Sequence, residues 1–184
     1  MTFDYPGYEL KFIQRQPCND RTAHLYTLVF KFFSPLTKYL YILRADYHLS
    51  DTFAIKFYCK KDRHSDYKYS KIVNRGDIGN ILITCAKVVP ILLKDYPTAS
   101  FGFAGARTID TKSKKVENYN NNQRFRTYKY LIALKFGTQI FAHYEYEAIS
   151  SYLLVNKFHD NIENMEREIV KMFSETYETL PDIV

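Results

Sequence analysis

The first half of the chain alternates apolar and polar positions with the two-residue period of β-strands. Runs rich in Tyr, Phe, Leu and Ile cover residues 25–33, 38–47 and 51–59, and a further candidate strand covers 67–73. The connections are short, and the one that contains Pro35 is a turn signal. Because short links favour pairing between consecutive strands, these runs predict an antiparallel meander.

The apolar period becomes helical after Asp77. From Ile78 to Leu92, apolar residues recur at three- and four-residue spacing, which predicts an amphipathic helix with Asp77 as its N-cap. Pro90 lies inside this run and should kink it, because proline removes a backbone hydrogen bond. A short strand over 99–106 follows, and its glycines permit close approach of another backbone.

The rest of the chain mixes both patterns. A polar, asparagine-rich loop covers 112–123, and apolar positions from Phe125 to Phe136 then predict a second helix. Strand-like runs cover 139–146 and 149–155. A capping-box-like sequence at Asp160 begins a C-terminal helix over about 160–178.

These elements follow one another without an internal repeat or a linker, so we expect one domain over 1–184 with a core over about 24–157. The predicted fold class is α+β: a twisted, mainly antiparallel sheet with two or three helices packed on one face. The C-terminal helix should pack on the sheet through its apolar stripe. The alternative is that this stripe forms a homo-oligomer contact.

Composition narrows the class of protein. The chain has a net charge of +6, and its aromatic residues are 17 Tyr and 14 Phe, many of which must be core. No apolar run is long enough to cross a membrane and no signal peptide is visible, so we expect a cytoplasmic protein. Cys18, Cys59 and Cys85 form no Cys-x-x-Cys pair, and the five histidines lack metal-ligand spacing. We therefore expect no metal and no cofactor.

Cations and aromatic residues accumulate between positions 101 and 130. We name as the basic segment Arg107, Lys112, Lys114, Lys115, Tyr119, Arg124, Arg126, Tyr128 and Lys129. Arginines bind phosphate with two parallel hydrogen bonds, tyrosines stack on bases, and a helix N-terminus favours anions. The segment thus predicts binding to nucleic acid or to an acidic protein surface. The alternative is a solvated loop and a polar helix face, with Phe125 and Tyr128 in the core.

We find no nucleophile motif and no phosphate-binding loop, and therefore expect no catalytic residue. His143 is the position to watch, because acids follow it at spacings that keep them on one face of a strand. A metal-independent ribonuclease would need a base, an acid and a cation, which His143, Glu145 or Tyr128, and Arg126 could supply. The alternative is a strand histidine hydrogen-bonded to a neighbour.

One resemblance rests on the order of several short motifs. They are Asn74-Arg75-Gly76-Asp77, the apolar stretch 81–89, Tyr96-Pro97, the glycine strand and the Arg124-Phe-Arg-Thr-Tyr helix start. In this order the chain resembles, over roughly 24–157, a family of small Bacteroidota proteins filed as a domain of unknown function. Two departures are Gly105-Ala106, where the family has Gly-Ser/Thr, and the gap widened by 108–123. The resemblance implies the fold and a cytoplasmic location, and brings no activity.

The sequence therefore predicts a small, non-catalytic binding module whose region 101–130 engages its partner. One alternative is an inhibitor or antitoxin-like protein of phage conflict that masks a partner enzyme. Another is a metal-independent ribonuclease toxin.

Overall fold

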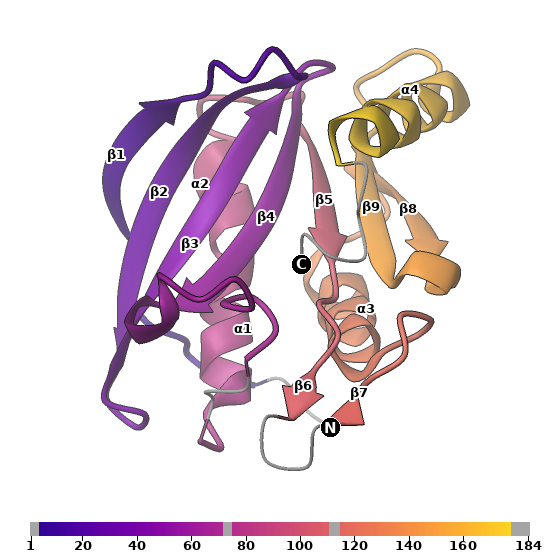
Figure 1. Ribbon diagram of the computed structural model, residues 1–184. Helices are drawn as coiled ribbons and strands as arrows, with labels where there is room; N and C mark the ends of the chain where they lie inside the picture. The colour runs from indigo at the N-terminus through magenta and orange to yellow at the C-terminus, as the bar shows by residue number, and fades with distance from the viewer. Residues whose placement is uncertain (1–3, 72–74, 111–114, 178–184) are drawn as a thin grey trace.

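The computed structural model describes residues 4–71, 75–110 and 115–177. Its main element is a seven-stranded, mainly antiparallel sheet with the order β1-β2-β3-β4-β5-β9-β8 (Figure 1). The strands are β1 (Lys11–Pro17), β2 (His24–Ser34), β3 (Tyr39–His48), β4 (Thr52–Cys59), β5 (Ser100–Ala104), β8 (Phe141–Tyr146) and β9 (Ser151–Asn156). A separate short hairpin pairs β6 (Ile109–Asp110) with β7 (Lys115–Val116).

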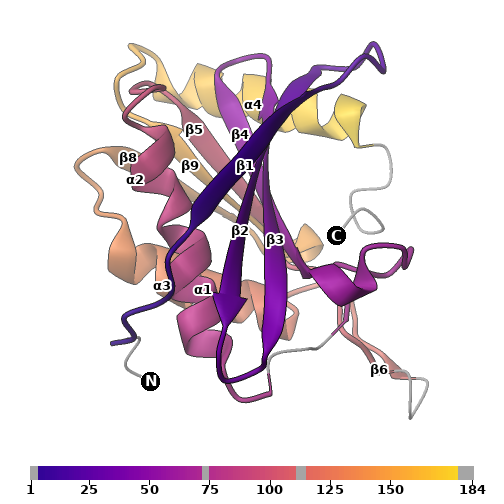
Figure 2. The same ribbon diagram turned by 90° about the vertical axis from the view of Figure 1, so that its left-hand side faces the viewer.

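Helices cover both faces of this sheet (Figure 2). The apolar core on one face contains residues of α1 (Ile78–Ala86), α2 (Val88–Leu92) and α3 (Gln123–Lys135). The other face carries α4 (Ile162–Thr176), which packs on Leu153 and Val155 of β9. Two single-turn 3-10 helices, Lys60–Asp62 and Glu147–Ile149, complete the described elements. The predicted single-domain α+β fold with a mainly antiparallel sheet is confirmed, with α1, α2 and α3 on one face and α4 added on the other.

The meander β1 to β4 is antiparallel throughout, and the alternating pattern predicted its part from β2 to β4. Helices α1 and α2 then cross one face, and the chain returns as β5, parallel to β4. Large aromatic side chains fill the centre of the core, where the stacked rings of Phe53 and Phe101 are fully buried. Among the described residues, no helix is both long and apolar enough to cross a membrane.

Local structure departs from the sequence-based expectations at three places. Residues 67–70 form turns instead of a strand, and residues 72–73 of that prediction lie outside the described residues. Strand β1 was not predicted, because it is an edge strand with most of its residues exposed and lacks the alternation of a half-buried strand. The predicted kink occurs at Lys87, between α1 and α2, because Pro90 has no N–H for the carbonyl of Ala86.

The glycine strand meets α3 through a tight junction. An added Cβ at Gly105 would lie 2.7 Å from the backbone nitrogen of Phe125, so the close approach excludes a side chain. The side chain of Asn122 donates to the Gly105 carbonyl at 2.5 Å and accepts from the Phe125 N–H at 2.9 Å, which caps α3. This junction fixes the direction in which the first turns of α3 present their side chains.

Candidate functional site

The seven-stranded sheet divides where its two parallel strands end. Strands β4 and β5 pair only from Thr52 opposite Ser100 to Ile55 opposite Phe103. Beyond this point β4 stays paired with β3 as far as Cys59, while β5 stays paired with β9. The carboxyl ends of the parallel strands therefore separate, and such a crevice is where ligands bind in open α/β sheets.

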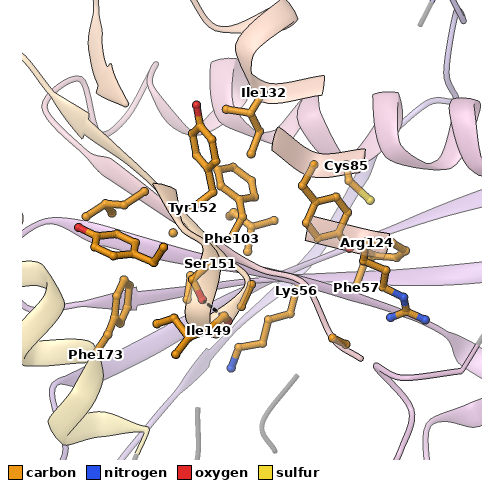
Figure 3. A pocket seen from close by; sticks show the side chains of 18 of the residues that line it. Lys56, Phe57, Cys85, Phe103, Arg124, Ile132, Ile149, Ser151, Tyr152 and Phe173 are labelled. Carbon is orange, nitrogen blue, oxygen red and sulfur yellow. Dashed lines mark hydrogen bonds between the residues drawn. The ribbon is translucent and has the colours of Figure 1, made fainter. Parts of the chain in front are cut away.

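A half-open cavity of about 140 Å³ lies in this divergence. Its lining is mostly apolar and comes from both faces of the sheet, including Cys85 and Ile132 from the helices on one face and Phe173 of α4 from the other (Figure 3). An apolar cavity of about 150 Å³ engineered into another protein stays dry and binds benzene. The volume here therefore suits one ring-sized group.

Arg124 reaches this cavity from the first turn of α3 (Figure 3). Its guanidinium donates to the backbone carbonyl of Tyr69, and to that of Lys71 at 2.8 Å. Burial lowers the pKa of Arg124, whereas the fields of Tyr128 and Glu117 act in the opposite direction. No described carboxylate forms an ion pair with this guanidinium, and its hydrogen-bond acceptors among the described residues are carbonyl oxygens.

Tyr128 lies one helical turn further along α3 and lines the same cavity. Burial raises the pKa of its phenol to about 12, so the hydroxyl is a donor at neutral pH. Within the described part of the chain this hydroxyl makes no hydrogen bond. The Cys85 thiol also lines the cavity, and burial raises its pKa, which keeps the sulfur protonated and unreactive.

The opposite wall of the cavity carries Lys56, from the diverging part of β4. Its ammonium lies 2.9 Å from the carboxylate of Asp46, which is buried on the neighbouring strand β3. Asp46 also accepts from Thr27 at 2.6 Å and lies 3.7 Å from the guanidinium of Arg44. Burial alone would raise the pKa of Asp46, but Lys56, Thr27 and Arg44 together lower it below its ordinary value.

The end of α4 closes this polar wall. The hydroxyl of Tyr177 lies 2.8 Å from Nε2 of His48 and accepts from Lys56 at 3.4 Å. Its ring also lies beneath the ammonium, 4.5 Å from Nζ to the ring centroid. Burial lowers the pKa of His48 to about 4, with a smaller contribution from His24 in the same direction. His48 is therefore neutral at physiological pH, and Asp46 balances one of the two neighbouring cations.

The structure distributes the basic segment over several environments. Arg124 and Tyr128 line the cavity, while Lys129 pairs with Glu145 and lies 3.4 Å from the carboxylate of Glu147. The hydrogen bond that Lys129 donates to Glu145 is the main reason that the pKa of Lys129 is raised. These three side chains therefore do not join one positive surface.

The other described members of the basic segment lie nearer the surface. The guanidinium of Arg107 lies 3.8 Å from the ring centroid of Tyr119, and Lys115 is exposed on the short strand β7. Arg126 is also exposed, and its guanidinium donates to the carbonyl of Asn121. Lys112 and Lys114 lie outside the described residues.

His143 does not have the accessibility that a general base needs. Its Nδ1 lies 2.8 Å from the hydroxyl of Tyr152, and its Nε2 is buried without a hydrogen-bond partner in the described chain. Glu145, the predicted acid, is paired with Lys129 instead. The arrangement fits the alternative of a strand histidine bonded to its neighbour.

Several residues in and next to the cavity were missed in the sequence. Lys56 interrupts an apolar strand, and Asp46 likewise follows buried Ala45, so charges inside apolar strands were a usable signal. Gly102 had a different role, because an added Cβ would lie 2.8 Å from the ring of Phe173. Nothing local to the sequence predicts that contact, since 71 positions separate the two residues.

No family model, curated protein or solved structure matches this chain.

Proposed function

We propose that this protein is a non-catalytic binding module whose cavity between β4 and β5 takes a ring-sized apolar group bearing a hydrogen-bond acceptor or a negative charge. The observation that carries the proposal is the phenol of Tyr128, which has no acceptor among the described residues and lies beside Arg124 in a mostly apolar lining. Tyr128 is half-buried, and a ligand acceptor at this position would give its hydroxyl a hydrogen bond in a poorly solvated setting.

The charge of the walls supports an anionic end on the ligand. On one side of the cavity, Arg124 is held by backbone carbonyls. On the other side, the two positive charges of Lys56 and Arg44 exceed the single negative charge of Asp46 by one. In a poorly solvated cavity such an excess attracts a carboxylate or a phenolate more strongly than it does in water. The binding role fits better than a catalytic one, because the Cys85 thiol and the Tyr128 phenol both have raised pKa values.

Paired ring-sized probes test this proposal. Benzoate and benzyl alcohol would be titrated into the protein, with binding followed by calorimetry and by the NMR signals of the protein. We expect benzoate to bind more tightly, and Tyr128→Phe to weaken benzoate about tenfold by removing one hydrogen bond to a charged group. Tyr130→Phe, an exposed tyrosine on the same helix, is the matched control. If Tyr128→Phe and Tyr130→Phe bind benzoate with equal affinity, the Tyr128 hydroxyl does not contact the ligand.

A second candidate function rests on the stacked pair Arg107 and Tyr119. Together with exposed Lys115 and Arg126, this pair supports the proposal that the protein binds single-stranded nucleic acid. If these three cations each neutralise one phosphate, affinity should fall about 20-fold between 50 and 200 mM salt. An acidic protein partner is the alternative that the same cations would serve.

Charge-reversal variants distinguish binding at a defined surface from binding driven by the net positive charge of the protein. The double variant Arg107→Glu and Arg126→Glu should abolish binding of a fluorescent single-stranded oligonucleotide. A control with the same change in net charge is Lys60→Glu with Lys94→Glu, because both lysines are exposed elsewhere. Equal loss in the two variants would show that net charge alone drives binding. Purification at low salt would reveal a co-purifying protein, which the masking-inhibitor hypothesis requires.

A further inference from the structure

The loop between β1 and β2 brings three different metal-ligating groups together. The sulfur of Cys18, a carboxylate oxygen of Asp20 and a ring nitrogen of His24 all lie within 4.8 Å of one another. We infer that this triad binds one divalent transition-metal ion of the zinc type. The three side chains would provide three ligands, and solvent would complete a tetrahedral site.

Hydrogen bonds on β2 and β3 prepare His24 for this role. Its Nε2 lies 3.0 Å from the hydroxyl of Thr27, and that hydroxyl donates its own hydrogen to Asp46 at 2.6 Å. Thr27 must therefore accept from His24, so Nε2 carries a ring hydrogen and Nδ1 is the nitrogen left to bind an ion. Asp46 stands behind this bond, 3.7 Å from Nε2. A metal-binding histidine typically donates its other N–H to a nearby oxygen in this way.

The loop itself holds the remaining ligands in place. One carboxylate oxygen of Asp20 accepts from the N–H of Thr22 at 2.9 Å and from its hydroxyl at 2.7 Å. The Thr22 hydroxyl accepts in turn from the N–H of His24 at 3.2 Å. At the start of the loop, the N–H of Cys18 donates to the carbonyl of Leu25 at 3.0 Å. These contacts fix the loop backbone and the Asp20 carboxylate before any ion binds.

The chemistry of these ligands selects the kind of ion. Thiolate and imidazole prefer zinc-like ions, whereas magnesium and calcium prefer oxygen. Binding forms a sulfur–metal bond and releases the Cys18 thiol proton to solvent, without oxidation or reduction.

Cobalt absorbance gives a direct test on the full, metal-free chain. Titration with Co²⁺ should saturate at one equivalent with a thiolate-to-cobalt charge-transfer band, and one equivalent of Zn²⁺ should remove the band. Cys18→Ser should abolish it, and His24→Gln should weaken cobalt binding at least tenfold. His64→Gln, which changes an exposed histidine outside the triad, should leave the titration unchanged. Absence of the band, or its persistence in Cys18→Ser, would overturn the inference.

Alkylation tests the same site without any variant. Cys18 is partly exposed, whereas Cys59 and Cys85 are buried, so iodoacetamide should modify Cys18 first. One equivalent of Zn²⁺ should slow this modification at least tenfold. An unchanged rate of Cys18 alkylation in the presence of Zn²⁺ would place any bound ion elsewhere and refute the site.

Discussion

The carboxylate of Asp46 and the ammonium of Lys56 lie 2.9 Å apart on neighbouring strands, on the face of the sheet that carries α4. They are diagonal neighbours, because Asp46 is opposite Ala54 and Lys56 is opposite Arg44. The carboxylate therefore lies between two cations in a setting with little solvent. Its charge makes the burial of both cations tolerable.

Asp46→Asn should destabilise the protein by about 3 kcal/mol, because removing one partner of a buried ion pair leaves the other charge uncompensated. Urea unfolding at pH 7 would measure the loss. Asp66→Asn, which changes an exposed carboxyl, should alter the free energy of unfolding by less than about 0.5 kcal/mol. Equal stability of the two variants would mean that water reaches Lys56 and Arg44.

Arg124→Gln should cost about 2 kcal/mol, because the carbonyls of Tyr69 and Lys71 would lose charged donors. Arg126→Gln is the matched control on the same helix, with an exposed side chain and one carbonyl contact at Asn121. Its effect should stay within about 0.5 kcal/mol. Thermal unfolding of both variants would distinguish an arginine that stabilises the fold from one available for a partner.

Gly105→Ala should destabilise the protein by about 1–3 kcal/mol, because the new methyl group would meet the backbone of α3 at Phe125. Gly137→Ala provides the comparison, since an added Cβ there meets nothing within 4 Å. Urea unfolding of both variants would measure the difference. A neutral Gly105→Ala variant would show that α3 can shift away from β5 without penalty.

Tyr128 should make stability depend on alkaline pH. Its folded-state pKa of about 12 exceeds the ordinary value of 10.0, so its contribution is complete below pH 10 and disappears as pH rises to 12. Between these values the wild type should lose about 2 kcal/mol more than Tyr128→Phe, since one pKa unit corresponds to about 1.4 kcal/mol. Unfolding free energies at pH 10, 11 and 12 would measure this difference, and parallel curves would contradict it.

The element order was predictable because its signals are local. The β2, β3 and β4 segments alternate clearly, and the apolar period changes at Ile78, where α1 begins. The division between β4 and β5 was not predictable, since it depends on where parallel pairing stops between residues 48 positions apart in sequence. The cavity follows from that division, so it shares the same long-range origin.

The fate of the predicted basic segment shows the same limit. Its composition is visible in the sequence, but the acceptors of Arg124 come from Tyr69 and Lys71, more than 50 positions earlier. Likewise, Lys129 is neutralised by Glu145 on β8, across a helix–sheet contact. Charge counting predicts how many cations a segment holds. Tertiary contacts decide which of them reach solvent.

The short pairing between β4 and β5 divides the sheet into two parts, a meander of four strands and a smaller three-stranded unit. A group bound in the cavity would contact both parts at once and restrict their movement about the boundary between β4 and β5. Amide hydrogen exchange along Lys56 and Phe57 should then slow when the cavity is filled. Ligand binding would thereby make the sheet more rigid, with no change in the connectivity of the strands.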